Sequence, residues 1–236
     1  MSVFDRIKQM VGNEPVDVNK AIEDVKRWRA ESEAGQMERF TKQIADHQAN
    51  ESIGRSGILP LHQGCTIENY IAESEGQQRA ANFSRWFCDS FNENNGGGFI
   101  FGGAPGTGKN HLAAAICNEL MHGNKSCLVI TVTELMQKLR NCYQKDSETT
   151  EDKFIRTMVD FDLLILDEVG LQRRTDAEML ALNQIVDQRI SRFKPTGMLT
   201  NLSPKEMTDC LGARIMDRMR MNGGKWIKFD WGSYRK

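Results

Sequence analysis

The sequence predicts an α/β protein in which a parallel five-stranded β-sheet lies between helices. Short apolar segments alternate with helical segments from about residue 77 onward, the pattern of a parallel sheet covered on both faces. A glycine-rich segment stands between the first apolar segment and the next helix, where phosphate-binding loops occur. The 236 residues are 39% hydrophobic and 27% charged, as in soluble globular proteins. The net charge of −1 excludes a broadly basic nucleic-acid coat but allows a local basic patch.

The expected elements follow in order from apolar runs and helical spacing. The apolar runs are too short for helices, and we expect them to form the strands 99–101, 127–132, 163–166, 197–200 and 226–229. Segments with apolar residues at helical spacing surround these runs, and we expect helices at 77–91, 111–121, 134–143, 153–159, 179–192, 205–211 and 213–221. The strands therefore alternate with helices throughout the expected domain.

Residues 1–52 are expected to form a small helical region, residues 53–76 a linker or entry segment, and residues 77–236 the main domain. Three glycines and a proline at 51–64 suit either a linker or a loop laid on the domain. Phe4 and Ile7 share one face of a short helical pattern, and Trp28 stands among charged residues on a second one. Such narrow apolar stripes either pack against the main domain or form a binding surface for another protein. We favour a partner, because aromatic side chains in polar surroundings are typical of binding surfaces.

The N-terminus has no apolar run of the kind found in signal peptides, and no segment is long enough to span a membrane. The six cysteines are scattered, without a CxxC pair or a cysteine–histidine cluster. Reduced thiols in a cytoplasmic protein fit this pattern best, and no zinc site is indicated.

The glycine-rich segment fits G-x-x-x-x-G-K, the phosphate-binding loop. Its glycines let backbone N–H groups turn toward phosphate oxygens, and the following helix N-terminus adds positive potential. The expected nucleotide-binding residues are Gly103, Ala104, Pro105, Gly106, Thr107, Gly108, Lys109, Asn110 and His111. Asn110 replaces the usual Ser or Thr, and its amide oxygen could still face Mg²⁺ directly or through water.

A second motif supports nucleotide hydrolysis. The strand at 163–166 ends in Asp167 and Glu168, the Walker B form. Asp167 would hold Mg²⁺ or its waters, and Glu168 would orient and deprotonate the attacking water. Together the two motifs predict an ATP or GTP hydrolase rather than a dinucleotide enzyme, whose fingerprint is G-x-G-x-x-G.

Later residues resemble the rest of such a site. Asn201 follows the strand 197–200, where its side chain could contact the γ-phosphate; a simple strand-end turn is the alternative. Arg214 and Arg218 share a helix face and could stabilise transition-state charge in a neighbouring subunit, or form surface salt bridges, for instance through Asp217. Arg235 stands at the end of the chain.

Taken together, these residues resemble the AAA+ ATPases, and more narrowly the bacterial replicative helicase loaders of the DnaC type. The resembling segments, which include the unusual Asn110, are 55–63, 68–70, 106–120, 195–201, 214–220 and 231–235. The resemblance implies that Arg218 is an arginine finger acting in trans, that Asn201 is sensor 1 and that Arg235 is sensor 2. The chain stops one residue after Arg235, so no full helical lid is expected.

The resemblance also implies partners. The N-terminal helices would bind the hexameric replicative helicase of the DnaB type, and the ATPase domains would assemble as a spiral or ring with ATP and Mg²⁺ between neighbours. Single-stranded DNA would be bound along the inner surface, where Tyr143 could stack on a base or, alternatively, pack in the core beside Leu139. A transposition-helper ATPase of the IstB type is the alternative function. A small-molecule P-loop kinase is a third, but no lid or acceptor pocket is indicated.

Overall fold

Five parallel strands form a sheet in the order β2-β3-β4-β1-β5 in a computed structural model of the chain. The strands are β1 (Phe99–Gly103), β2 (Cys127–Thr131), β3 (Leu163–Val169), β4 (Thr196–Thr200) and β5 (Lys225–Phe229). The structure describes residues 56–93, 96–144, 149–171 and 175–234. Four residues of the sequence predictions lie outside this range, namely Phe4, Ile7, Trp28 and Arg235.

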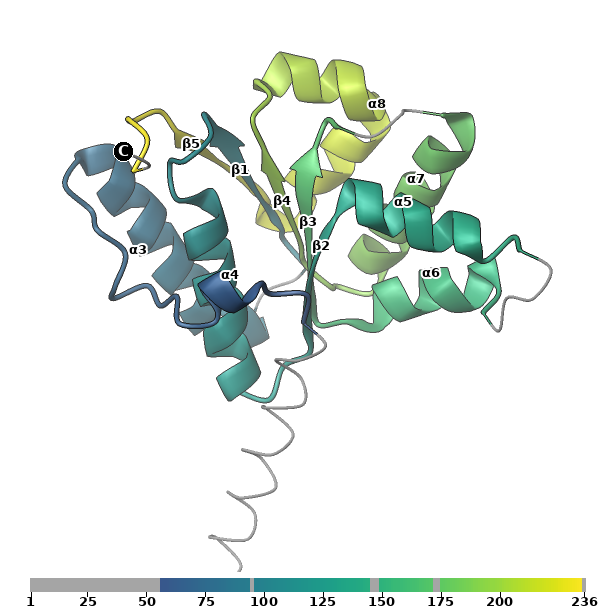
Figure 1. Cartoon of the computed structure of the whole chain (residues 1–236), viewed down its shortest axis with the longest axis horizontal. Helices are drawn as coiled ribbons and strands as arrows, with labels where there is room; N and C mark the ends of the chain where they lie inside the picture. The colour runs from purple at the N-terminus through teal and green to yellow at the C-terminus, as the bar shows by residue number, and fades with distance from the viewer. Residues whose placement is uncertain (1–55, 94–95, 145–148, 172–174, 235–236) are drawn as a thin grey trace, which may run out of the picture. The chain divides into compact units, whose positions relative to one another are not determined.

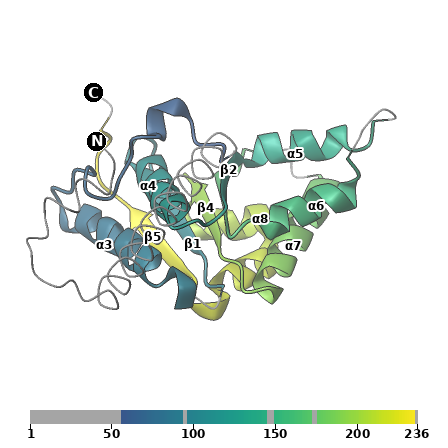
Figure 2. The same cartoon turned by 90° about the horizontal axis from the view of Figure 1, so that it is seen from below.

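Helices cover both faces of the sheet (Figure 1). They are α3 (Glu75–Asp89), α4 (Lys109–His122), α5 (Val132–Asn141), α6 (Glu151–Asp160), α7 (Asp176–Ser191) and α8 (Pro204–Arg220), with short 3-10 turns η1 (Pro60–His62), η2 (Phe91–Glu93) and η3 (Met221–Gly223). Helices α3 and α4 lie on one face and α5 to α8 on the other, as the view from below in Figure 2 also shows. The predicted α/β class with a five-stranded parallel sheet is confirmed.

Alternation along the strands builds one core on each face of the sheet. In β1, Phe99 and Phe101 join the cluster under α3 and α4, whereas Ile100 joins the cluster under α5 to α8. Because successive side chains of a strand point to opposite faces, short continuous apolar runs can fill both cores. Phe99 also requires Gly197 on the neighbouring strand β4, since a Cβ there would lie 2.7 Å from its ring.

Local side-chain caps fix the starts of α3, α5, α6, α7 and α8, and each cap stabilises its helix by about 1 kcal/mol. The capping residues are Ser74, Thr131, Thr150, Thr175 and Ser203. These caps explain the small boundary differences from the sequence predictions: Thr175, for example, starts α7 at Asp176 rather than at residue 179. Inside α8, Gly212 adopts φ 81° and breaks the helix into the two predicted segments.

The segment that precedes α3 packs on the domain over its described residues. Ser56 and Ile58 are buried, and the Val129 N–H of β2 donates to the Ser56 carbonyl (2.7 Å). Asn118 of α4 donates to three carbonyls of this segment, including that of Cys65 (2.9 Å). The described part of this segment is therefore a loop laid on the domain, the second of the two sequence alternatives.

Candidate nucleotide-binding site

The carboxyl ends of β1, β3 and β4 bring the predicted phosphate and water-activating residues together. A cavity of about 220 Å³ lies there, lined among others by Lys109, Asn110, Asp167, Glu168 and Asn201. These side chains come from the ends of β3 and β4 and from the first turn of α4. Ligands of parallel α/β sheets bind at this edge of the sheet, because the loops and helix N-termini converge there.

The phosphate-binding loop has the backbone that its glycines predict. Gly106 and Gly108 adopt φ values of 77° and 89°, which side chains other than hydrogen rarely allow. Buried Lys109 donates from Nζ to the carbonyls of Gly103 (2.7 Å) and Ala104 (2.8 Å). The full positive charge of the lysine is thus held under the loop, within reach of the space that phosphate would occupy.

Asn201 contacts this lysine directly. Its Oδ1 accepts from Lys109 Nζ at 2.9 Å, a pairing that the sequence analysis did not anticipate. The neighbouring Thr200 holds the strand end in place, since its hydroxyl donates to the Val169 carbonyl (2.7 Å) and accepts from the Leu202 N–H (3.1 Å). The predicted alternative for Asn201, a simple strand-end turn, does not account for a side chain that meets the phosphate-loop lysine.

Asp167 and Asn110 form the candidate metal-binding pair. Asn110 Nδ2 donates to Asp167 Oδ2 at 2.9 Å, and the Glu168 N–H donates to the other carboxylate oxygen at 2.7 Å. Burial raises the pKa of Asp167, although these hydrogen bonds and the charge of Lys109 partly oppose the shift. A carboxylate and an amide offer the hard oxygen ligands that Mg²⁺ prefers, so the donor set fits this ion.

Protein side chains alone do not complete a metal site. No cluster of three or more His, Cys, Asp or Glu side chains that could hold a metal occurs within the described residues. Magnesium in nucleotide sites takes most of its ligands from phosphate and water, so one carboxylate and one amide suffice there. Asp167 and Asn110 could therefore hold Mg²⁺ only together with a bound triphosphate.

Glu168 stands at an irregularity of the sheet. The β3–β4 register shifts between Leu166 and Val169, and Glu168 adopts a left-handed φ of 54°. Bulges and left-handed non-glycine residues cost stability and concentrate at functional sites, because they redirect side chains. The bulge leaves the Glu168 side chain exposed at the cavity, where a carboxylate could orient and deprotonate water.

A second cavity lies on the other side of the phosphate loop and was not foreseen from the sequence. It measures about 400 Å³ and is lined among others by Leu61, Tyr70, Ile71, His111 and Tyr234. Aromatic and aliphatic walls next to a phosphate site suit a planar nucleotide base. The predicted nucleotide-binding role of His111 is consistent with this place, where its Nε2 lies 3.0 Å from the Thr66 carbonyl.

The last described residues of the chain bind the phosphate loop next to this cavity. Trp231 Nε1 donates to the Thr107 carbonyl (2.9 Å), and the Tyr234 N–H donates to the Gly106 carbonyl (2.8 Å). The Tyr234 hydroxyl accepts from Gln77 Nε2 (2.7 Å). Tyr70 and Tyr234 lie in two of the segments that resemble the helicase loaders. Their common place beside the phosphate loop is visible only in the folded structure.

The arginines of α8 do not line the cavities around the phosphate loop of their own chain. Arg214 and Arg218 both bind Asp187 of α7. Both therefore form surface salt bridges, the alternative named above, but through Asp187; Asp217 pairs instead with Arg220 at 3.4 Å. Tyr143 is 59% exposed, so the alternative that it packs in the core beside buried Leu139 is wrong.

Comparisons with known proteins assign the family. Residues 41–223 match the model of the IstB-like ATP binding protein family. Over 233 residues, the chain is 41% identical to the replicative helicase loader DnaC of Escherichia coli K12, an alignment that covers 99% of this chain and 94% of that protein. The chain belongs to the family of IstB-like ATP-binding proteins and DnaC-type helicase loaders.

Other members and solved structures agree with this family. The replicative helicase loader DnaC of Buchnera aphidicola (Schizaphis graminum) is 36% identical over 99% of this chain and 94% of that protein. The crystal structure of the DnaC helicase loader has a TM-score of 0.64 at 22% identity, covering 72% of this chain and 99% of that chain. A replication initiator DnaA bound to AMPPCP and single-stranded DNA has a TM-score of 0.63 at 22% identity, covering 74% of this chain and 51% of that chain.

The curated relatives, the family model and the solved structures each support a different expectation from the sequence. The predicted membership in the AAA+ loaders of the DnaC type is confirmed by the curated relatives, and the family model supports ATP binding. The low-identity structures support the AAA+ fold. Among the described residues, no helix combines the length and apolarity that crossing a membrane requires.

Proposed function

We propose that this protein is an ATP-dependent loader that delivers the replicative DNA helicase to single-stranded DNA during the initiation or restart of replication. The observation that carries this proposal is the 41% identity to DnaC over nearly the whole chain, together with the triphosphate-binding geometry at Lys109. We place its action in the cytoplasm, where its six free cysteines would stay reduced.

In this proposal each site residue has one task. Lys109 exchanges its contacts with two loop carbonyls for the β- and γ-phosphates, and Asn201 moves with it to the γ-phosphate. Glu168 orients the attacking water and accepts its proton. Asp167 and Asn110 would hold Mg²⁺, which would neutralise charge on the phosphate oxygens when bound. The base would occupy the neighbouring cavity, whose walls include Tyr70, Ile71 and Tyr234.

Hydrolysis serves as an assembly switch rather than a metabolic step. Copies of the chain would associate as a spiral or ring, with Arg218 of one copy reaching the triphosphate of its neighbour and Arg235 acting as sensor 2. The N-terminal region, with Phe4, Ile7 and Trp28, would bind the hexameric helicase. Exposed Tyr143, just beyond α5, would stack on a base of single-stranded DNA.

The decisive experiment is mass determination of the full-length protein mixed with a DnaB-type helicase, with and without ATP and Mg²⁺. The proposal expects a defined complex that changes in size when ATP is added, and loss of the complex when residues 1–50 are deleted. A mixture that shows no complex in either condition would contradict the proposal. A complex that survives the deletion would move the helicase-binding surface elsewhere on the chain.

A separate experiment tests the proposed role of Arg218 as an arginine finger acting in trans. Arg218→Ala should leave ATP binding unchanged, because the residue does not line the cavities of its own chain, yet abolish DNA-stimulated hydrolysis. Calorimetric titration with ATP and a phosphate-release assay measure the two quantities. Normal stimulated hydrolysis by Arg218→Ala would remove the role in trans.

A transposition-helper ATPase is the second candidate, and the match to the IstB-like family model favours it specifically. We rank it lower, since relatives named helicase loader align over 99% of the chain. Strong binding to duplex DNA without any retention of helicase in a pull-down would reverse this order.

A further inference from the structure

Arg214 and Arg218 converge on a single carboxylate, that of Asp187. Asp187 Oδ1 accepts from Arg218 Nε at 2.7 Å, and Asp187 Oδ2 accepts from Arg214 Nη2 at 2.5 Å. Asp187 lies on α7, whereas both arginines lie on the second segment of α8, which packs beside α7 (Figure 1). The contact therefore joins two neighbouring helices at the surface.

Helix stability does not explain an aspartate at this position. Asp187 lies near the C-terminal end of α7, where the helix dipole disfavours a negative charge, and aspartate is a weak helix former. Its side chain is only 21% exposed, so the carboxylate is partly removed from water. The two arginines compensate for this placement, which points to a role for the carboxylate in holding them.

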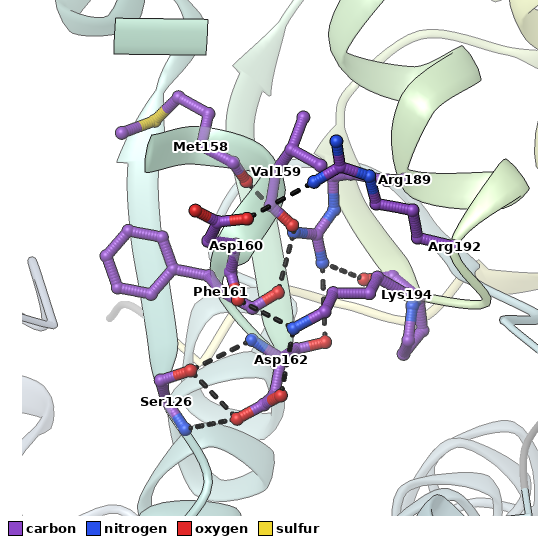
Figure 3. A network of polar contacts seen from close by, with 10 residues as sticks. Ser126, Met158, Val159, Asp160, Phe161, Asp162, Arg189, Arg192 and Lys194 are labelled. Carbon is purple, nitrogen blue, oxygen red and sulfur yellow. Dashed lines mark hydrogen bonds and ion pairs between the residues drawn. The ribbon is translucent and has the colours of Figure 1, made fainter. Parts of the chain in front are cut away.

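The helix that carries Asp187 is anchored by a buried arginine. Arg189, two residues further along α7, is fully buried and donates to the carbonyls of Met158 (2.9 Å), Phe161 (2.8 Å) and Pro195 (2.6 Å), as Figure 3 shows in part. These carbonyls belong to the end of α6 and to the segments that lead into β3 and β4. Asp187 is thus fixed to the sheet through its own helix, and a rigid support of this kind is what a precisely oriented functional group requires.

The way in which Asp187 holds Arg218 leaves one end of the guanidinium available. Arg218 uses Nε for the carboxylate and Nη1 for the Met221 sulfur (3.3 Å), while Nη2 has no partner among the described residues. The Arg218 side chain is 38% exposed and that of Arg214 is 69% exposed. An arginine held by Nε presents its outer nitrogens in a fixed direction, and fixing it beforehand lowers the entropy cost of a later contact.

We infer that Asp187 is a positioning residue for the arginine finger: it holds Arg218 by Nε so that Nη2 of the guanidinium reaches the triphosphate bound by a second copy of this chain. Arg214 binds the second carboxylate oxygen and keeps the carboxylate from rotating away from Arg218. This inference rests on the proposed function, because it requires that Arg218 act in trans.

The test uses two full-length variants that are each inactive alone. Glu168→Gln binds ATP but lacks the water-activating carboxylate, so it serves as a donor of the finger. Arg218→Ala keeps a complete hydrolytic site but lacks the finger, so it serves as the acceptor. In the mixture, DNA-stimulated phosphate release should return only at contacts where an acceptor site meets a donor finger.

The donor is then changed at Asp187. A Glu168→Gln donor that also carries Asp187→Asn should restore about tenfold less hydrolysis, because small displacements of a catalytic group cost up to about 100-fold in rate. The loss should appear in kcat and not in the KM of the acceptor for ATP, since the acceptor site is untouched. An unchanged KM would show that the change in the donor leaves the ATP site of the acceptor intact.

Asp217→Asn in the same donor is the matched control, since Asp217 also pairs with an arginine of α8 but lies 73% exposed. This donor should restore as much hydrolysis as the parent donor. Equal melting temperatures of the three donors, and equal association with the acceptor by sedimentation, exclude a loss through unfolding or weaker assembly.

The outcomes separate the inference from the function on which it rests. If the parent donor does not restore the acceptor, the finger in trans is wrong and the inference falls with it. If the parent donor restores hydrolysis and the Asp187→Asn donor restores as much or more, only the inference is overturned, because Asp187 then either does nothing or restrains the finger.

Discussion

Two aspartates at opposite ends of β3 have opposite electrostatic environments. Asp162 stands just before the strand, and burial alone would raise the pKa of its carboxyl. The N–H and hydroxyl of Ser126 and the ammonium of Lys194 outweigh that effect and lower the pKa (Figure 3). Asp167 stands at the other end, where burial dominates and raises the pKa. Hydrogen bonds and an ammonium group thus stabilise the ionised form of Asp162, whereas burial destabilises the ionised form of Asp167.

The same contrast separates the two cations that are buried among the described residues. Arg189, at the amino end of the sheet, meets five backbone carbonyls and the Thr196 hydroxyl, and burial lowers its pKa to about 9. Lys109, at the carboxyl end, donates to two loop carbonyls and to Asn201, and it lines a cavity. The charges at the amino end therefore hold elements together, whereas those at the carboxyl end can exchange their partners for a ligand.

The largest expected effect is on ligand binding at the carboxyl end. Lys109→Ala removes the charge that faces phosphate, which costs about 3 kcal/mol and weakens ATP binding about 100-fold or more. The melting temperature should change by no more than about 2 °C, since the loop carbonyls become accessible to water. Calorimetric titration and thermal unfolding measure these values, and exposed Lys205→Ala is the control. Unchanged ATP affinity would refute the assignment of the site.

At the amino end the effect should fall on stability instead. Arg189→Met leaves several buried carbonyls without donors, at a cost of about 3–5 kcal/mol, so the melting temperature should fall by about 10 °C. Below the transition, ATP affinity should stay within about twofold of that of the parent protein. The matched control is Arg192→Met, since that exposed arginine pairs with Asp160 alone among the described residues, and its loss should cost about 1 kcal/mol at most. If Arg189→Met lowered ATP affinity but not the melting temperature, the charges at the amino end of the sheet would not have the purely structural role assigned to them.

The smallest expected effects are the melting-temperature shifts caused by replacing Asp162 and Asp167, which should have opposite signs. Asp162→Asn should lower the melting temperature at pH 7 by about 2–4 °C through weakened hydrogen bonds, whereas Asp167→Asn should raise it by about 1–3 °C by removing a strained charge. Thermal unfolding between pH 3 and pH 8 measures both, under conditions that keep the protein reversible. Shifts of the same sign would show that the two ends do not differ in this way.

The pH dependence follows from the two pKa shifts. The stability that Asp162 contributes is present above the ordinary aspartate pKa of about 4 and is lost as the pH falls through its lowered value. For Asp167 the sign is reversed: its folded form favours the proton, so stability is lost as the pH rises through the raised value. The differences between the parent and either variant should therefore shrink at low pH.

Local patterns determined much of this protein. The strand runs were readable because short apolar runs between helical segments suit strands buried on both faces, and the phosphate loop because its glycines and Lys109 stand between a strand and a helix. Asp167 and Glu168 were readable because they end a buried strand. Gly212 alone was enough to divide α8, since a left-handed φ is a local property.

Tertiary structure alone decided the contacts between distant segments. Tyr234 meets Gln77 across 157 residues of chain, and Arg218 meets Asp187 across 31 residues. Arg189 gave no signal in the sequence, because its partners are mostly backbone carbonyls, which every residue carries. The sequence gives the type of each side chain. Which hydrogen-bond acceptors surround that side chain is decided only when the sheet and its helices pack together.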